Sequence, residues 1–98
     1  MIEDYKINRA DYLLLSTLYA SGCKDYYHSM TITEMIDDNS DENGNHPLGT
    51  RMTVYRKLQK LVANGYISKG IMDDHSDTYY IEEKAIRIIE DGGNEVWA

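Results

Sequence analysis

The sequence predicts a single small α+β domain that is mostly helical, and three observations support this fold class. Helix signals occupy four stretches, at 8–20, 31–38, 50–64 and 82–91. Two β-rich stretches, 66–71 and 78–81, flank a polar turn and predict a hairpin. The 98 residues, 42% of them hydrophobic, suffice for one modest core. We therefore expect one domain over 1–98, with its core at 8–91 and a tail at 92–98.

The first predicted helix begins at Asn8, whose side chain can cap it, and is ended by Ser21 and Gly22. Its apolar residues cover nearly the whole circumference, which is more than one core face requires. Ile86 also lies off the apolar stripe of the last predicted helix, and Trp97 follows that helix. We therefore expect a homodimer, although cover by the N-terminal segment 2–7 is an alternative. The residues assigned to the dimer interface are Leu15, Tyr19, Ile86 and Trp97.

Between the first helix and the central one, the sequence predicts a short strand at 30–32, a brief helix and a long loop. Thr31 or Thr33 can cap the brief helix, and Thr31 with Glu34 has the spacing of a capping box. The stretch 39–47, NSDENGNHP, has the composition of an exposed acidic loop. We expect this loop insertion to be mobile, because 39–46 has no apolar side chain to anchor it.

The stretch 49–71, GTRMTVYRKLQKLVANGYISKGI, gives the clearest indication of function. Thr50 can cap a helix there, and Asn64 with Gly65 can end it. At about 100° per residue, the apolar side chains fall on one stripe. This stripe consists of Val54, Leu58, Leu61 and Val62. Facing away are Thr53, Arg56 and Lys60, flanked by Met52, Lys57 and Gln59.

The charge distribution separates this helix from the rest of the chain. Residues 43–72 contain five Lys or Arg and no Asp or Glu, whereas the other residues carry five Lys or Arg against 17 acids, or 5 − 17 = −12. A purely cationic helix face in an acidic chain indicates a surface that contacts phosphate, with chance as the alternative. Because the net charge of −7 repels nucleic acid at long range, any DNA binding must be local to this face.

In their order, these elements resemble the winged helix-turn-helix of the MarR/PadR-like bacterial regulators. The matching pieces are MTITEMI at 30–36, TVYRKLQKL at 53–61, NGYI at 64–67 and YYIEEKA at 79–85. The resemblance extends over 10–90 and implies a three-helix core, a two-stranded β-wing and a C-terminal helix. It also implies that the helix containing 53–61 is the recognition helix. The DNA-binding residues assigned on this basis are Thr50, Arg51, Thr53, Tyr55, Arg56 and Lys60, with Lys57 on the flank and Lys69 at the base of the wing.

The chain departs from the family pattern at the connector, the wing tip and the last helix. The loop at 39–47 replaces a tight turn, and Glu82 stands where such proteins often have a capping Thr. Asp73, Asp74 and Asp77 occupy a wing tip that usually carries Arg or Lys in DNA-binding members. We therefore expect the wing to stay out of the minor groove.

The resemblance leaves two function classes open. The first is sequence-specific binding of double-stranded DNA by a small dimeric transcriptional regulator or mobile-element accessory protein. The second is a winged helix used for protein–protein interaction, in which the acidic loop and wing repel DNA. An enzyme is not expected, because the sequence has no nucleophile elbow and no phosphate-binding Gly motif. His28, His46 and His75 lie in polar loops and are interpreted as surface side chains.

No cofactor, metal or membrane partner is expected, and no residue identifies a small-molecule effector. Asp41, Asn43 and Asn45 resemble the start of a calcium loop, but Met52 occupies the twelfth position, where such loops have Glu. His46 has no His or Cys at zinc-ligand spacing. The absence of a long apolar run or an export signal, and the single Cys23, favour the cytoplasm.

Overall fold

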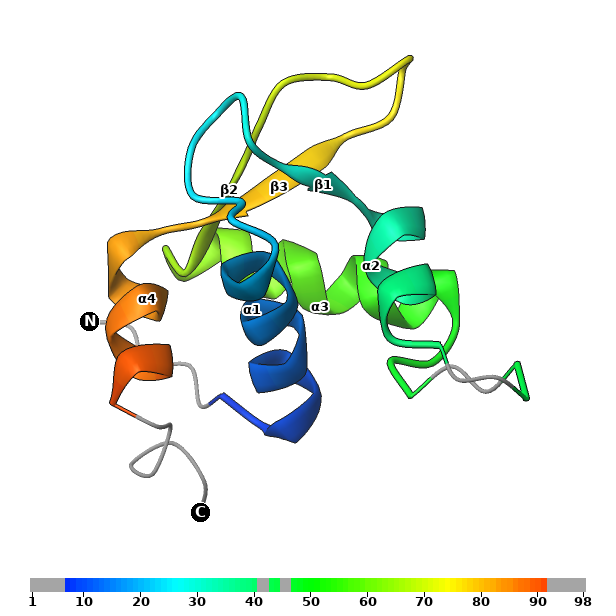
Figure 1. Cartoon of the computed structure of the whole chain (residues 1–98), viewed down its shortest axis with the longest axis horizontal. Helices are drawn as coiled ribbons and strands as arrows, with labels where there is room; N and C mark the ends of the chain where they lie inside the picture. The colour runs from blue at the N-terminus through cyan, green and yellow to red at the C-terminus, as the bar shows by residue number, and fades with distance from the viewer. Residues whose placement is uncertain (1–6, 41–42, 45–46, 92–98) are drawn as a thin grey trace.

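The structure is a computed structural model that describes residues 7–40, 43–44 and 47–91. Over these residues the chain forms helices α1 (Arg9–Ala20), α2 (Ile32–Asp38), α3 (Arg51–Ala63) and α4 (Glu83–Glu90). Its strands are β1 (Met30–Thr31), β2 (Ile67–Lys69) and β3 (Thr78–Ile81) (Figure 1). None of these helices is both long and apolar enough to cross a membrane. The predicted α+β class, with a majority of helix, is confirmed.

The three strands form one antiparallel sheet with β3 in the middle, in the order β1-β3-β2. The predicted hairpin pairs β2 with β3, and the short strand β1 pairs with the other edge of β3. Strand β2 ends at Lys69, so the expected strand at 70–71 is wrong. The reason is that the Ile71 amide donates to the carbonyl of Tyr26, 2.8 Å away in the loop before β1, instead of continuing the pairing with β3.

Capping boxes define the starts of α1 and α2. In α1, the Asp11 amide donates to the Asn8 side chain at 2.9 Å, and the Asn8 amide donates to the Asp11 carboxylate at 3.2 Å. In α2, the Glu34 amide donates to the Thr31 hydroxyl at 3.1 Å, and the Thr31 amide donates to the Glu34 carboxylate at 2.9 Å. Both predicted caps are confirmed, because a cap depends only on residues close together in the sequence.

One hydrophobic core lies between the sheet and the helices, and α1 is at its centre. Helix α1 contacts α2, α4 and β3, while α3 contacts α2 and β2 (Figure 1). The largest fully buried side chains are Tyr79, Leu14, Leu15, Leu18, Met35, Leu58, Leu61, Ile67, Ile81, Val54 and Asp11. The broad apolar circumference of α1 is therefore used largely within the monomer.

The expectation that Leu15 lies outside the core is wrong, because its side chain is 0% exposed. It has no surface to offer a partner subunit, and we remove it from the dimer interface. Tyr19 and Ile86 are only partly buried against the core. Trp97 lies outside the described residues.

The acidic loop at 39–47 is described only in part. At its start, the Asn39 side-chain amide donates to the Thr17 hydroxyl at 2.8 Å, which ties the end of α2 to α1. After the loop, Leu48 is 3% exposed and anchors the chain before α3. Residues 41–42 and 45–46, and with them the expected mobility of the loop, lie outside the described residues.

Replacing Thr31 tests the importance of the α2 cap. Thr31→Ala removes the hydroxyl that accepts from the Glu34 amide, and we expect it to lower the free energy of unfolding by about 1–2 kcal/mol. Thr31→Ser retains the hydroxyl and should lose no more than about 0.5 kcal/mol. Urea unfolding followed by circular dichroism measures both variants. Equal stability of the two variants would contradict the role given to the cap.

Candidate nucleic-acid interface

Helix α3 has one buried side and one exposed side. Val54, Leu58 and Leu61 are each 0% exposed and pack into the core, as the helical spacing predicts. We call the exposed side chains of this helix the exposed face of α3. They are Arg51, Met52, Thr53, Tyr55, Arg56 and Lys60, with Ala63 at the C-terminal end. The core packing thus fixes which cationic groups point outward.

The N-terminus of α3 is arranged differently from those of the other helices. Thr50 caps it as predicted, because its hydroxyl accepts from the Thr53 amide at 3.2 Å. The first turn of α3 contains no acid, whereas α1, α2 and α4 each have one there: Asp11, Glu34 and Glu83 respectively. The partial positive charge of a helix N-terminus favours an anion, and at α3 no carboxylate of the first turn supplies one.

The side chain of Arg51 extends from α3 to α2 and does not point toward the apolar side of α3. Its Nη1 donates to the hydroxyl of Thr33 at 2.6 Å, and the residue is exposed. The angular count placed Arg51 near the apolar stripe. In the structure, its position in the first turn lets the long side chain reach the neighbouring helix instead. A guanidinium has five N–H donors, so this single bond leaves others for a ligand.

Lys57 faces α1 and is not part of the exposed face of α3. Its Nζ lies 3.9 Å from the Asp11 carboxylate, and the two side chains are 23% and 0% exposed. The same carboxylate caps α1 by accepting from the Asn8 amide. We therefore assign Lys57 to the scaffold, since its charge compensates a buried carboxylate.

Lys69, at the base of the hairpin, is also paired with an acid. Its Nζ lies 3.4 Å from the carboxylate of Asp77, and both side chains are about half exposed. The hairpin tip is a tight turn in which Asp74 and His75 have φ values of 49° and 73°. The exposed carboxylates at this tip make it acidic, so Lys69 adds little net positive charge there.

A pocket of about 550 Å³ lies between α3 and the hairpin tip. From α3 it is lined by Arg51, Met52 and Tyr55, and from the hairpin by His75, Ser76 and Asp77. Ile32 of α2 and Tyr79 of β3 complete the lining. Of the predicted site residues, the structure therefore brings Arg51 and Tyr55 together.

Met52, His75 and Tyr79 were not predicted as site residues. They come from α3, the hairpin turn and β3, and only the tertiary arrangement brings them together. The only sequence signal that could have pointed to one of them is the exposed Met52 beside a cationic face.

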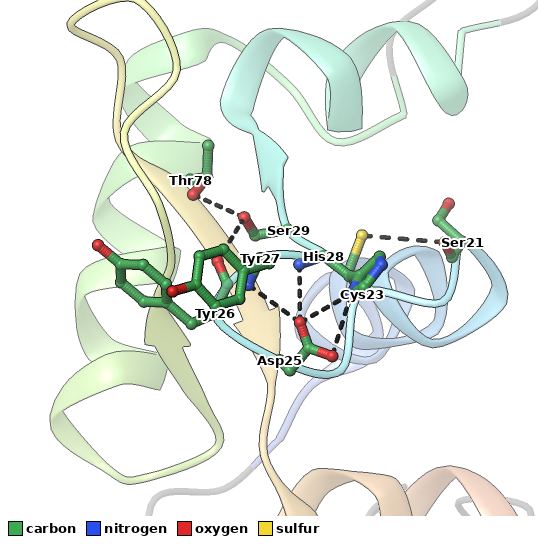
Figure 2. Close-up of polar contacts among 8 residues, drawn as sticks. All are labelled: Ser21, Cys23, Asp25, Tyr26, Tyr27, His28, Ser29 and Thr78. Atoms are coloured by element: carbon green, nitrogen blue, oxygen red, sulfur yellow. Dashed lines mark hydrogen bonds and ion pairs between the residues drawn. The ribbon is translucent and has the colours of Figure 1, made fainter.

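The turn before β1 supports the hairpin from the side (Figure 2). The Asp25 carboxylate contacts Nδ1 of His28 at 2.8 Å and accepts from the amides of His28 and Tyr27 at 2.8 and 3.0 Å. These contacts, the His28 side chain first, lower the pKa of Asp25 below its usual range. The turn is thus held in a fixed shape by a single charged side chain.

A chain of hydrogen bonds connects this turn to the hairpin. The Ser29 hydroxyl donates to the Thr78 hydroxyl at 2.8 Å (Figure 2), and the Thr78 hydroxyl donates to the Ile71 carbonyl at 2.5 Å. Gly70 lies so close that an added Cβ would come within 2.5 Å of Ser29 Oγ and 2.8 Å of the Tyr26 carbonyl. The orientation of the hairpin relative to the rest of the sheet is therefore fixed by the neighbouring turn.

Cys23 and the acidic side chains do not form a cluster that could hold a metal ion in the part of the chain that the structure describes. Residues 7–40, 43–44 and 47–91 contain no group of three or more His, Cys, Asp or Glu that could hold a metal ion. Burial, and then the nearby carboxylates of Glu34, Asp25 and Asp38, raise the pKa of the Cys23 thiol. Because the thiolate is the reactive form, a raised pKa disfavours reaction at Cys23.

No protein-family model and no curated protein sequence matches this chain. The interpretation of the exposed face of α3 therefore depends on its own geometry and charge.

Proposed function

We propose that the chain binds double-stranded DNA through the exposed face of α3, as a small dimeric sequence-specific regulator or mobile-element accessory protein. The observation that carries the proposal is the face itself. It presents Arg51, Arg56 and Lys60 with no acidic residue anywhere on α3, in a protein of net charge −7. In this proposal α1, α2 and α3 are the helical core of a winged helix, and the β2–β3 hairpin is its wing.

The side chains of α3 suit different parts of a DNA duplex. Arg56 and Lys60 are exposed and one helical turn apart, so they project from the same side. An arginine can pair with both acceptors of a guanine edge in the major groove, whereas a lysine neutralises phosphate. The first turn of α3, capped by Thr50, offers backbone amides to a phosphate. The proposed contacts thus combine base recognition with backbone positioning.

The hairpin opposes DNA binding in this arrangement. Asp73 and Asp74 are exposed at its tip, and the charge of Lys69 is offset by Asp77. Repulsion from these carboxylates would keep the tip away from phosphate, so sequence recognition would fall to α3 alone.

A protein-binding role is the second candidate, and a specific observation favours it. Tyr26, Tyr27, Ile71 and Met72 are exposed, with exposed fractions of 48%, 73%, 40% and 57%. The hydrogen bond between the Ile71 amide and the Tyr26 carbonyl brings the two segments side by side. Exposed aromatic and apolar side chains in one place are typical of a protein interface.

Substitutions on α3 test the assigned roles. Arg56→Ala should cost about 1–3 kcal/mol on the preferred site and remove the preference at one base pair. Lys60→Ala should weaken binding to all sequences alike and reduce the salt slope by about one ion. Lys57→Ala is the matched control, because it removes a lysine that faces α1. Since it also removes the counter-charge of the buried Asp11, a thermal unfolding curve checks that the variant is folded, and the folded variant should bind DNA like the wild type. Fluorescence anisotropy at two salt concentrations, after selection from a randomised duplex pool, measures all three.

Two outcomes would count against the proposal. If the wild-type protein selects no site and shows no salt-dependent binding at low ionic strength, the protein-binding role takes its place. If Lys57→Ala weakens binding as much as Lys60→Ala, the assignment of the DNA-binding face to the exposed side of α3 is wrong.

Neutralising the hairpin tip should strengthen DNA binding. The double substitution Asp73→Asn, Asp74→Asn removes two negative charges next to the proposed interface, and asparagine tolerates the left-handed backbone at position 74. We expect tighter binding at low salt with an unchanged sequence preference. The control Asp37→Asn, Asp38→Asn removes the same charge from exposed positions at the end of α2 and should have a smaller effect. Equal effects of the two double variants would mean that only net charge matters.

The proposed dimer is formed by α1 and α4. The Tyr19 hydroxyl donates to the Glu90 carboxylate at 3.1 Å, so the C-terminal ends of the two helices lie side by side, and the partly buried Ile86 is on the same helix as Glu90. Two-fold symmetry would place two α3 helices about 34 Å apart, one turn of B-DNA.

Sedimentation of the wild type and of Ile86→Lys tests this arrangement. We expect a dimer of the 11.3 kDa chain at micromolar concentration for the wild type, and a shift toward monomer for the variant, because a charge is costly in an apolar interface. A wild type that sediments only as an 11.3 kDa species would remove the dimer.

A further inference from the structure

We propose that the pocket between α3 and the hairpin tip binds a single nucleotide, with the base inside and the phosphate at the mouth beside Arg51. Its volume of about 550 Å³ is in the range of small-ligand sites. The inference rests on the proposed function, because the pocket's location at the exposed face of α3 is what favours a nucleotide over other planar anions.

The side chain of Tyr79 provides the polar contact for a base. Tyr79 is 0% exposed, and its hydroxyl has no hydrogen-bond partner among the described residues. Burial, then the charge of Asp77 and the nearby phenol of Tyr55, raise its pKa. Tyr79 lines the pocket together with Asp77 and Tyr55. At neutral pH the hydroxyl is protonated and can donate a hydrogen bond to a carbonyl oxygen or a ring nitrogen of a ligand.

The walls of the pocket suit a flat ring. Ile32, Met52 and Tyr55 supply an aliphatic, a thioether and an aromatic surface. Met52 and Tyr55 are 57% and 43% exposed, so their side chains have room to rearrange around a ligand. A nucleobase offers the flat ring and the acceptor together.

The charges at the mouth favour a phosphate on the α3 side. Arg51 carries a permanent charge and is oriented by its hydrogen bond to Thr33. Arg51 and Met52 also belong to the first turn of α3, where the backbone amides favour an anion. On the hairpin side, Asp77 is paired with Lys69, and the other carboxylates of the tip would repel a phosphate.

Two sources could supply this chemistry. One is a free nucleoside monophosphate, whose binding would place a phosphate next to the DNA-binding face and compete with DNA. The other is an unpaired nucleotide that turns out of a DNA strand, for which the loss of stacking must be offset by the pocket. Both present the same base and phosphate to Tyr79 and Arg51.

Titration with the four deoxynucleoside monophosphates, followed by NMR, tests the pocket directly. At least one should bind the wild-type protein at high-micromolar to millimolar concentration. Tyr79→Phe removes one oxygen from a well-packed ring and should weaken this binding about tenfold. The control Tyr80→Phe changes the next residue of β3, which points to the other face of the sheet, and should bind like the wild type.

Because Tyr79 is buried, Tyr79→Phe could disturb the fold, and two further measurements therefore test the pocket without this variant. Arg51→Gln, an exposed substitution, should weaken the monophosphate several-fold. The deoxynucleoside without phosphate should bind the wild type more weakly than its monophosphate, because it lacks the anion that Arg51 recognises. A thermal unfolding curve for each variant confirms that the fold is retained.

Duplexes distinguish the two sources. A duplex with one unpaired nucleotide is compared with the fully paired duplex of the same sequence. If the unpaired duplex binds tighter and Tyr79→Phe removes the difference, the source is DNA. If a monophosphate binds and the duplexes are equal, the source is the free nucleotide.

The inference is overturned if no monophosphate binds and the unpaired duplex has no advantage, or if Tyr79→Phe and Arg51→Gln both bind like the wild type. If the protein binds duplex DNA but no monophosphate, and an unpaired nucleotide gives no advantage, nucleotide binding by the pocket is rejected and the proposed function is retained. Binding of a monophosphate without any binding of duplex would reject the proposed function instead.

Discussion

The pairing of β3 with both of its neighbours is the constraint on which the other elements depend. Thr31 pairs with Thr78 of β3 and, in the same position, caps α2, so the sheet determines where α2 begins. Strand β2 pairs with the other edge of β3 and follows directly after α3. The middle strand therefore positions α2 and α3 relative to each other, and the exposed face of α3 with them.

The features that could be predicted from the sequence are those decided by near neighbours. The caps at Asn8, Thr31 and Thr50 need only three or four residues, and the division of α3 into a buried and an exposed side needs only its period. The left-handed position of Gly65 after α3 belongs to the same group. These local choices agree with the global arrangement, which is typical of a sequence that specifies one fold.

The features that could not be predicted depend on residues far apart in the chain. Leu15 is covered by several elements at once, and only the three-dimensional arrangement shows that a single monomer suffices. Lys57 looks like a surface cation until its pairing with Asp11 of α1 is known. Tyr79 looks like a core aromatic, and only the folded structure shows that it lines a pocket and that its buried hydroxyl has no hydrogen-bond partner among the described residues. Helical periodicity assigns faces but does not identify partners.

The contact between the hairpin and the turn before β1 has a mechanical consequence. Gly70 leaves no space between the two segments, and the hydrogen bond from Ile71 to Tyr26 joins their backbones. The loops project together from one side of the sheet (Figure 1). A displacement of the turn that contains Tyr26 and Tyr27 would therefore be transmitted to the hairpin. The hairpin tip that carries Asp73 and Asp74 is part of the same joined unit.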